Sequence, residues 1–125
     1  MKGKLALALA ALTALALAGL AYADFNPIRG TNGPDTIIGT GGPDLIVALK
    51  GDDTVDAEGG NDRVYAGEGN DRLHALAGDG QVDVLNCGEG NDIAFENANE
   101  HDVFVNCEKI VRKTPTPQES TDDNG

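Results

Sequence analysis

The chain has 125 residues, and its 21 Asp and Glu against nine Lys and Arg give a formal charge of −12 at pH 7. This acidic balance excludes nucleic acid and anionic membrane surfaces as natural partners and favours cations. Glycine occupies 17 positions, aromatic residues make up only 4%, and Trp is absent, so we expect many turns around a small core.

Residues 1–23 have the pattern of a secretory signal peptide: a basic start, an almost pure Leu/Ala run and a final Ala-Tyr-Ala that suits cleavage. A retained membrane anchor is the alternative, for which the apolar run is only marginally long enough. No cysteine follows the run, so a lipoprotein anchor is not supported. Cleavage before Asp24 would remove two basic and no acidic residues, leaving 102 residues with a formal charge near −14. The signal predicts a secreted, extracellular protein.

Residues 30–74 consist of five nonapeptides in phase, GTNGPDTII, GTGGPDLIV, ALKGDDTVD, AEGGNDRVY and AGEGNDRLH. Position eight is always a branched aliphatic residue, position four is always glycine and position six is always aspartate. The glycines are Gly33, Gly42, Gly51, Gly60 and Gly69. The aspartates are Asp35, Asp44, Asp53, Asp62 and Asp71. Three fixed positions held over five units indicate one structural unit repeated.

The last three residues of each nonapeptide are too few for a helix and suit a strand that points position eight to one side. The six residues before them are rich in Gly, Asn, Asp and Pro, which is turn chemistry. Glycine at position four permits a positive φ and a close backbone approach. The pattern therefore predicts a coil with two nonapeptides per circuit, stacked at about 4.8 Å, around a core of one file of aliphatic residues.

Stacking places Asp35, Asp53 and Asp71 in one row and Asp44 and Asp62 in another. Carboxylates at strand spacing repel unless cations lie between them, and calcium takes six to eight oxygen ligands. Each calcium site would use aspartates from two stacked turns together with turn carbonyls, so the middle Asp53 would serve two sites. Turns that are acidic only for solvation would need no fixed phase with glycine. Five equivalent sites also do not resemble one catalytic carboxylate pair.

The nonapeptide resembles the repeats-in-toxin, or haemolysin-type, calcium-binding repeat, whose consensus is G-G-x-G-x-D-x-U-x with U a large apolar residue. The resemblance covers residues 30–109. It implies an all-β fold, a right-handed parallel β-roll (a β-solenoid) with a C-terminal cap, that binds several Ca²⁺ ions. Toxins of the family carry an uncleaved C-terminal export signal, whereas this chain has the pattern of N-terminal export. Such rolls serve as folding aids, spacers and adhesive modules, so the resemblance says little about purpose.

The register breaks after residue 74, because residues 75–86 form a unit of twelve with three extra residues at 78–80. Its aspartate is Asp83, and Gln81 takes the position of the glycine, which weakens Asp83 as a predicted ligand. We expect a bulged turn at the insertion.

The next unit, CGEGNDIAF, restores the pattern with Gly90 and Asp92 as predicted site residues. Residues 96–105 form a glycine-free imitation that contains Asp102. Because terminal repeats of solenoids are atypical, this segment is expected to be the C-terminal cap.

Cys87 and Cys107 are the only cysteines, and a disulfide is expected in an exported protein. Twenty residues equal one circuit of eighteen plus a small insertion, so the two should lie about one strand spacing apart, within the 4.4–6.8 Å Cα window of disulfides. The sequences NCGEGND and NCE also resemble the C-terminal end of small secreted bacterial members of the family. Two free buried thiols remain the alternative.

The expected organisation is a signal peptide (1–23), a lead-in (24–29), the β-roll (30–112) and a disordered tail without apolar residues (113–125). No zinc helix, dinucleotide or phosphate loop, or EF-hand is present, so no enzyme is predicted. His74 is expected at an outward strand position rather than as a ligand.

The sequence thus predicts a secreted, monomeric module that binds several calcium ions, folds on export and acts outside the cell in a structural or interaction role. An accessory calcium-binding domain of a separately encoded secreted enzyme is the alternative. A flat ice- or carbohydrate-binding face is suggested only by Thr31 and Thr40, which are too few for an array.

Overall fold

The computed structural model describes residues 24–114, so the expected signal peptide and the end of the tail lie outside the described residues. The described chain has ten short strands and no helix, and therefore no helix that could cross a membrane. The strands are β1 (Asn26–Arg29), β2 (Thr36–Ile38), β3 (Asp44–Val47), β4 (Thr54–Asp56), β5 (Arg63–Tyr65), β6 (Arg72–Ala75), β7 (Val84–Asn86), β8 (Ile93–Asn97), β9 (Val103–Val105) and β10 (Lys109–Lys113). The predicted strands at the end of each nonapeptide are confirmed.

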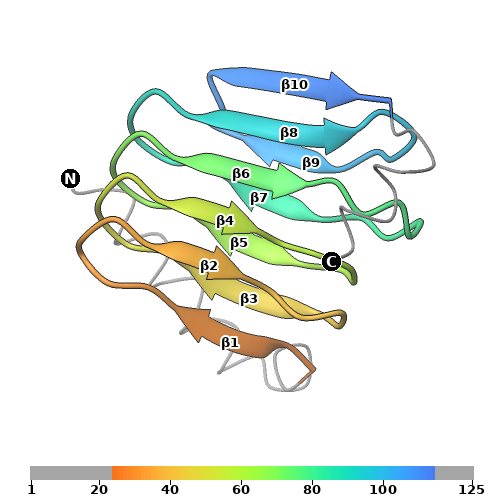
Figure 1. Ribbon diagram of the computed structural model, residues 1–125, viewed down its shortest axis with the longest axis horizontal. Coiled ribbons are helices and arrows are strands. Elements are labelled where there is room, and N and C mark those ends of the chain that lie inside the picture. Colours follow the sequence, from red (N-terminus) through yellow and green to blue (C-terminus); the bar gives the residue numbers. More distant parts are fainter. Residues whose placement is uncertain (1–23, 115–125) are drawn as a thin grey trace.

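The strands form two five-stranded sheets, ordered β1-β3-β5-β7-β9 and β10-β8-β6-β4-β2. Every pairing is parallel. Consecutive strands alternate between the sheets, so the chain winds a parallel β-solenoid of about five turns (Figure 1). The predicted β-roll architecture is confirmed.

Strand partners keep the spacing of two nonapeptides: Ile37 pairs with Val55, and Val55 pairs with Leu73. After the insertion the spacing rises to 21 residues, as in the pairing of Leu73 with Ala94. The same spacing joins β5 to β7. The three extra residues therefore remain in the turn, where Gly80 has a φ of +75°, and the strands stay in register.

Two files of side chains fill the space between the sheets, not the single file that we predicted. The first file comes from position eight, as expected. Its members are Ile37, Ile46, Val55, Val64, Leu73, Leu85 and Ala94. The second comes from position one, where small side chains are buried. Its members are Ala48, Ala57, Ala66, Ala75 and Cys87. Strand alternation explains this file, because position eight points inward, position nine outward and position one inward again.

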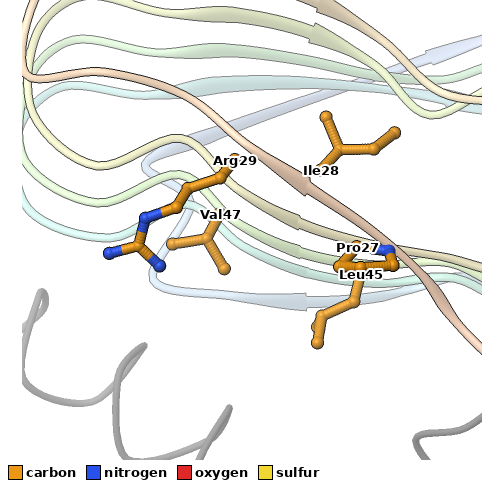
Figure 2. Close-up of a pocket in the computed structure, with 5 residues that line it drawn as sticks. All are labelled: Pro27, Ile28, Arg29, Leu45 and Val47. Atoms are coloured by element: carbon orange, nitrogen blue, oxygen red, sulfur yellow. The ribbon is translucent and has the colours of Figure 1, made fainter.

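The expected lead-in contains the first strand of the solenoid, because β1 pairs with β3. Ile28 packs against the core, and Figure 2 shows it on the opposite side of the strands from Leu45 and Arg29. Ile28 also lines a cavity of about 120 Å³, together with Pro27, Arg29, Leu45 and Val47. Pro27 has no N–H, which suits an edge strand and discourages pairing with another chain.

A disulfide and an ion pair fix the C-terminal cap. Cys87 and Cys107 are bonded with a Cα–Cα distance of 5.0 Å, so the predicted pairing is confirmed. Closing a loop of this length stabilises the fold by roughly 3 kcal/mol in the chain-entropy account. The buried Glu96 carboxylate accepts a hydrogen bond from Arg112 Nε at 2.8 Å, which joins β8 to β10.

Candidate metal centre

The aspartates of the repeat form the two predicted rows, and a hydrogen bond joins each row member to the next. In the first row, the N–H of Asp35 donates to Asp53 Oδ1 at 2.8 Å, and the N–H of Asp53 donates to Asp71 Oδ1 at 2.8 Å. The N–H of Asp71 donates to Asp92 Oδ1 at 2.7 Å. Each carboxylate therefore continues the hydrogen-bond ladder of the sheet into the turn.

The second row follows the same rule across the insertion. The N–H of Asp44 donates to Asp62 Oδ1, and the N–H of Asp62 donates to Asp83 Oδ1, both at 2.8 Å. Asp83, which we expected to be the weakest member, is therefore in line and buried. Asp102 ends the row by accepting the N–H of Asp83 at 2.9 Å.

Glu108 ends the first row, a role that the sequence analysis missed. Its Oε1 accepts the N–H of Asp92 at 2.9 Å, one circuit before it. A usable signal exists, because every row aspartate except Asp44, which begins β3, immediately precedes a strand, and Glu108 immediately precedes β10.

Three row aspartates combine deep burial with an incomplete hydrogen-bond set. Asp53, Asp62 and Asp71 are each 1% exposed. One oxygen of each accepts the N–H described above, but Oδ2 has no hydrogen-bond partner among the described residues. Burying an ionised carboxylate without compensation is costly, so such a group must take a proton or meet a cation.

The pKa values of the row aspartates reflect the same cost of burying a charged carboxylate. Burial raises the pKa of Asp62 and Asp71 from 3.8 to about 8, and that of Asp53 and Asp83 to about 7. The incoming backbone N–H opposes the rise, and repulsion from neighbouring carboxylates adds to it. At the end of the second row, burial raises the pKa of Asp102 to about 6.

Residues 30–47 form the first circuit of two nonapeptides. From the second circuit onward, the glycines at position four bring the turns into close contact. Gly51, Gly60, Gly69 and Gly90 have φ between +101° and +123°. A Cβ on Gly60 would lie 2.6 Å from Gly42 O, and one on Gly69 or Gly90 would overlap the carbonyl oxygen of the glycine one circuit earlier. Only glycine allows this approach, which brings the main-chain carbonyls of one turn against the backbone of the next.

Position two of these turns is also left-handed, which the sequence analysis did not predict. Leu49, Glu58, Gly67 and Gly88 have positive φ. The glycine that the family consensus places there is present in only some units. Leu49 and Glu58 adopt the same left-handed conformation without being glycine. In the first circuit neither Gly33 nor Gly42 has a positive φ, so these two predicted site residues belong to a different kind of turn.

These oxygens suit calcium. Residues 24–114 contain no group of three or more His, Cys, Asp or Glu side chains able to hold a metal, so a site here needs carbonyl oxygens as well as carboxylates. Carboxylate and carbonyl oxygens together are the ligands that calcium takes. The unsatisfied Oδ2 atoms and the glycine contacts both fit such an ion.

His74 lies on the outer face, stacked on Phe95 with ring centroids 4.7 Å apart.

Fold and site together define a class, the parallel β-solenoids whose stacked turns bind calcium. The sequence model of the RTX calcium-binding nonapeptide repeat (four copies) matches residues 29–64, 51–82 and 59–94, more than half of the chain. The chain belongs to this family and is a calcium-binding repeat module. The family is a calcium-binding repeat module and is typically non-catalytic. Comparison with curated proteins and with solved structures gave no significant match.

We expect the calcium-free folded state to lose stability as pH rises from about 4 to about 8. Asp62 and Asp71 keep their protons to about pH 8 when folded, whereas an unfolded chain releases them near pH 3.9. The unfolded state therefore binds fewer protons in this window, and rising pH favours unfolding, by up to about 1.4 kcal/mol per pH unit and group.

Dialysed, metal-free protein should show a thermal unfolding transition at pH 5, and at pH 8 a much lower Tm or no transition. Saturating calcium should reverse this order, because protons compete with the ion for the same oxygens. A higher Tm at pH 8 without calcium would show that the rows are not strained when ionised.

Proposed function

We propose that this protein is a secreted β-roll that holds several calcium ions between its stacked turns, folds on export and serves outside the cell as a structural or interaction module. The observation that carries the proposal is that Oδ2 of Asp53, Asp62 and Asp71 is buried and has no hydrogen-bond partner within residues 24–114. A buried polar atom without a hydrogen-bond partner needs an explanation, and a bound ion is a common one.

The proposed carboxylate ligands are aspartates of the two rows. Those of the second and later circuits are Asp53, Asp62, Asp71, Asp83 and Asp92. Turn carbonyls beside Gly51, Gly60, Gly69 and Gly90 supply the remaining protein oxygens. A bound calcium ion supplies the positive charge that lets stacked carboxylates stay ionised. The backbone N–H of the previous circuit holds one oxygen of each aspartate and so orients the carboxylate in its row.

Calcium titration by calorimetry tests this proposal with Asp71→Asn, which keeps an oxygen for the Asp53 N–H but removes the charge. Asp71 lies between Asp53 and Asp92 in its row. The substitution should therefore lower the calcium affinity at least tenfold or reduce the number of bound calcium ions by one. In chelator, the same variant should retain more β-structure by circular dichroism than the unmodified protein, because it removes a buried charge from the row. Opposite signs with and without calcium distinguish a ligand from a purely structural residue.

Asp102→Asn is the matched control, because Asp102 accepts the same kind of N–H bond but is half-buried at the end of its row. Its effect on calcium affinity should be smaller. Equal effects of the two substitutions would contradict a site built from stacked rows. Absence of any calcium uptake by the unmodified protein would contradict the proposed function itself.

The proposed secretion is supported by the N-terminal pattern, by the disulfide and by the family, whose members are typically secreted by bacteria. N-terminal sequencing of protein recovered from the culture medium should begin at Asp24. Recovery of the full-length chain in the membrane fraction would favour a retained anchor.

A further inference from the structure

In the first circuit, a threonine of the same turn holds each of the two aspartates. The N–H of Thr31 donates to Asp35 Oδ2 at 2.7 Å, and the Thr31 hydroxyl donates to Asp35 Oδ1 at 2.9 Å. Thr40 makes the same two bonds to Asp44, at 2.7 and 2.9 Å. Both oxygens of each carboxylate are therefore held by donors of the same turn.

Further contacts fix this arrangement. The Thr31 hydroxyl accepts the N–H of Gly33 at 3.1 Å, and the Thr40 hydroxyl accepts that of Gly42 at 3.2 Å. Asn26 Nδ2 adds a third donor to Asp44, at 3.1 Å from Oδ1. Although Asp44 is fully buried, it has no oxygen without a partner, in contrast to Asp62 in the same row.

The sequence of these turns is adapted to the contact. Each carboxylate folds back over the glycine at position one, where a Cβ on Gly30 or Gly39 would lie 2.7 Å from the Oδ2 of Asp35 or Asp44. At position one of the next five units the residue is Ala or Cys, and each of these side chains is buried in the core. The pattern G-T-x-G-P-D therefore specifies a self-contained turn.

We propose that calcium binding begins at the second circuit, and that Asp35 and Asp44 are capping residues rather than ligands. This inference rests on the proposed function, and it separates the aspartates of the first circuit from those of the later circuits. In the first circuit, N–H and hydroxyl donors occupy the carboxylates, and the left-handed glycines that bring carbonyls close are absent. Asp53 is then the first ligand of its row and Asp62 the first of the other, so the gap between the first two circuits takes no ion.

The test compares Asp44→Asn with Asp62→Asn in the full chain by calorimetric calcium titration. Both aspartates are buried and adjacent in one row, which makes them a matched pair. Asp62→Asn should remove a bound ion or weaken calcium binding at least tenfold. Asp44→Asn should leave the number of ions unchanged and the affinity within about twofold, while lowering the Tm in saturating calcium.

Thr40→Val supplies an independent arm, since it removes the capping hydroxyl and keeps the carboxylate. The number of calcium ions should stay the same and the Tm should fall, whereas Thr40→Ser, which retains a hydroxyl, should keep the Tm. Loss of an ion in Asp44→Asn, or a gain or loss of one in Thr40→Val, would overturn the inference while leaving the proposed function intact. A wild-type chain that binds no calcium would contradict both.

Discussion

At pH 8, removing calcium is expected to abolish most of the regular β-structure of the chain that begins at Asp24, and restoring calcium should recover the fold. Without metal, a chain with a formal charge near −14 must bring buried carboxylates to strand spacing. Its core consists of short aliphatic and small side chains in two files, with few residues per circuit. Such a small scaffold needs staples, and the disulfide fixes only the C-terminal end.

A site that exists only in the folded state converts its binding free energy into folding free energy. Circular dichroism of the chain beginning at Asp24 should therefore change from mostly irregular in chelator to β-rich in calcium. Extracellular calcium modules bind at about 10⁻⁴–10⁻³ M, so the transition should lie in that range of free calcium.

Magnesium is the control ion, because it demands near-octahedral geometry with shorter bonds and gives up its water reluctantly. It should restore little structure at concentrations where calcium is saturating. A complete β spectrum in excess chelator, unchanged by calcium, would show that the core and disulfide suffice without the ion.

The substitution Gly69→Ala should be among the most destabilising single changes in the roll. Gly69 has a φ of +123°, and a Cβ there would overlap Gly51 O. A left-handed conformation costs an L-residue roughly 1–2 kcal/mol, and overpacking adds about 1–3 kcal/mol. The free energy of unfolding in urea, measured in saturating calcium, should therefore fall by about 2–5 kcal/mol.

Two matched substitutions separate these causes. Gly33 occupies the same position four, but its φ is not left-handed and the nearest atom to a Cβ is 3.9 Å away. Gly33→Ala should therefore change stability by no more than about 0.5 kcal/mol. Gly80 has a φ of +75° and nothing within 4 Å, so Gly80→Ala should cost only the conformational part, about 1–2 kcal/mol. Equal losses at Gly33 and Gly69 would mean that all position-four turns are alike.

The sequence by itself determined the solenoid, its register, both aspartate rows as far as Asp71 and the Cys87–Cys107 pairing. This was possible because a solenoid makes its contacts at a fixed sequence separation, so phase along the chain directly gives position in space. Even the three-residue insertion could be placed, since only a turn can absorb extra residues without moving a side chain to the other face.

Only the tertiary structure decided what each aspartate does with its carboxylate. Asp44 and Asp62 occupy the same position of the repeat. Thr40 and Asn26 donate hydrogen bonds to Asp44, whereas Asp62 Oδ2 has no hydrogen-bond partner in the part of the chain that the structure describes. Which partners a row aspartate finds depends on the φ values of its turn and on donors from another circuit. A repeat consensus, which gives only the residue type at each position, does not contain this information. The inward file at position one and the role of Glu108 were decided in the same way, because both depend on where the backbone directs a side chain after its strand ends or before it begins.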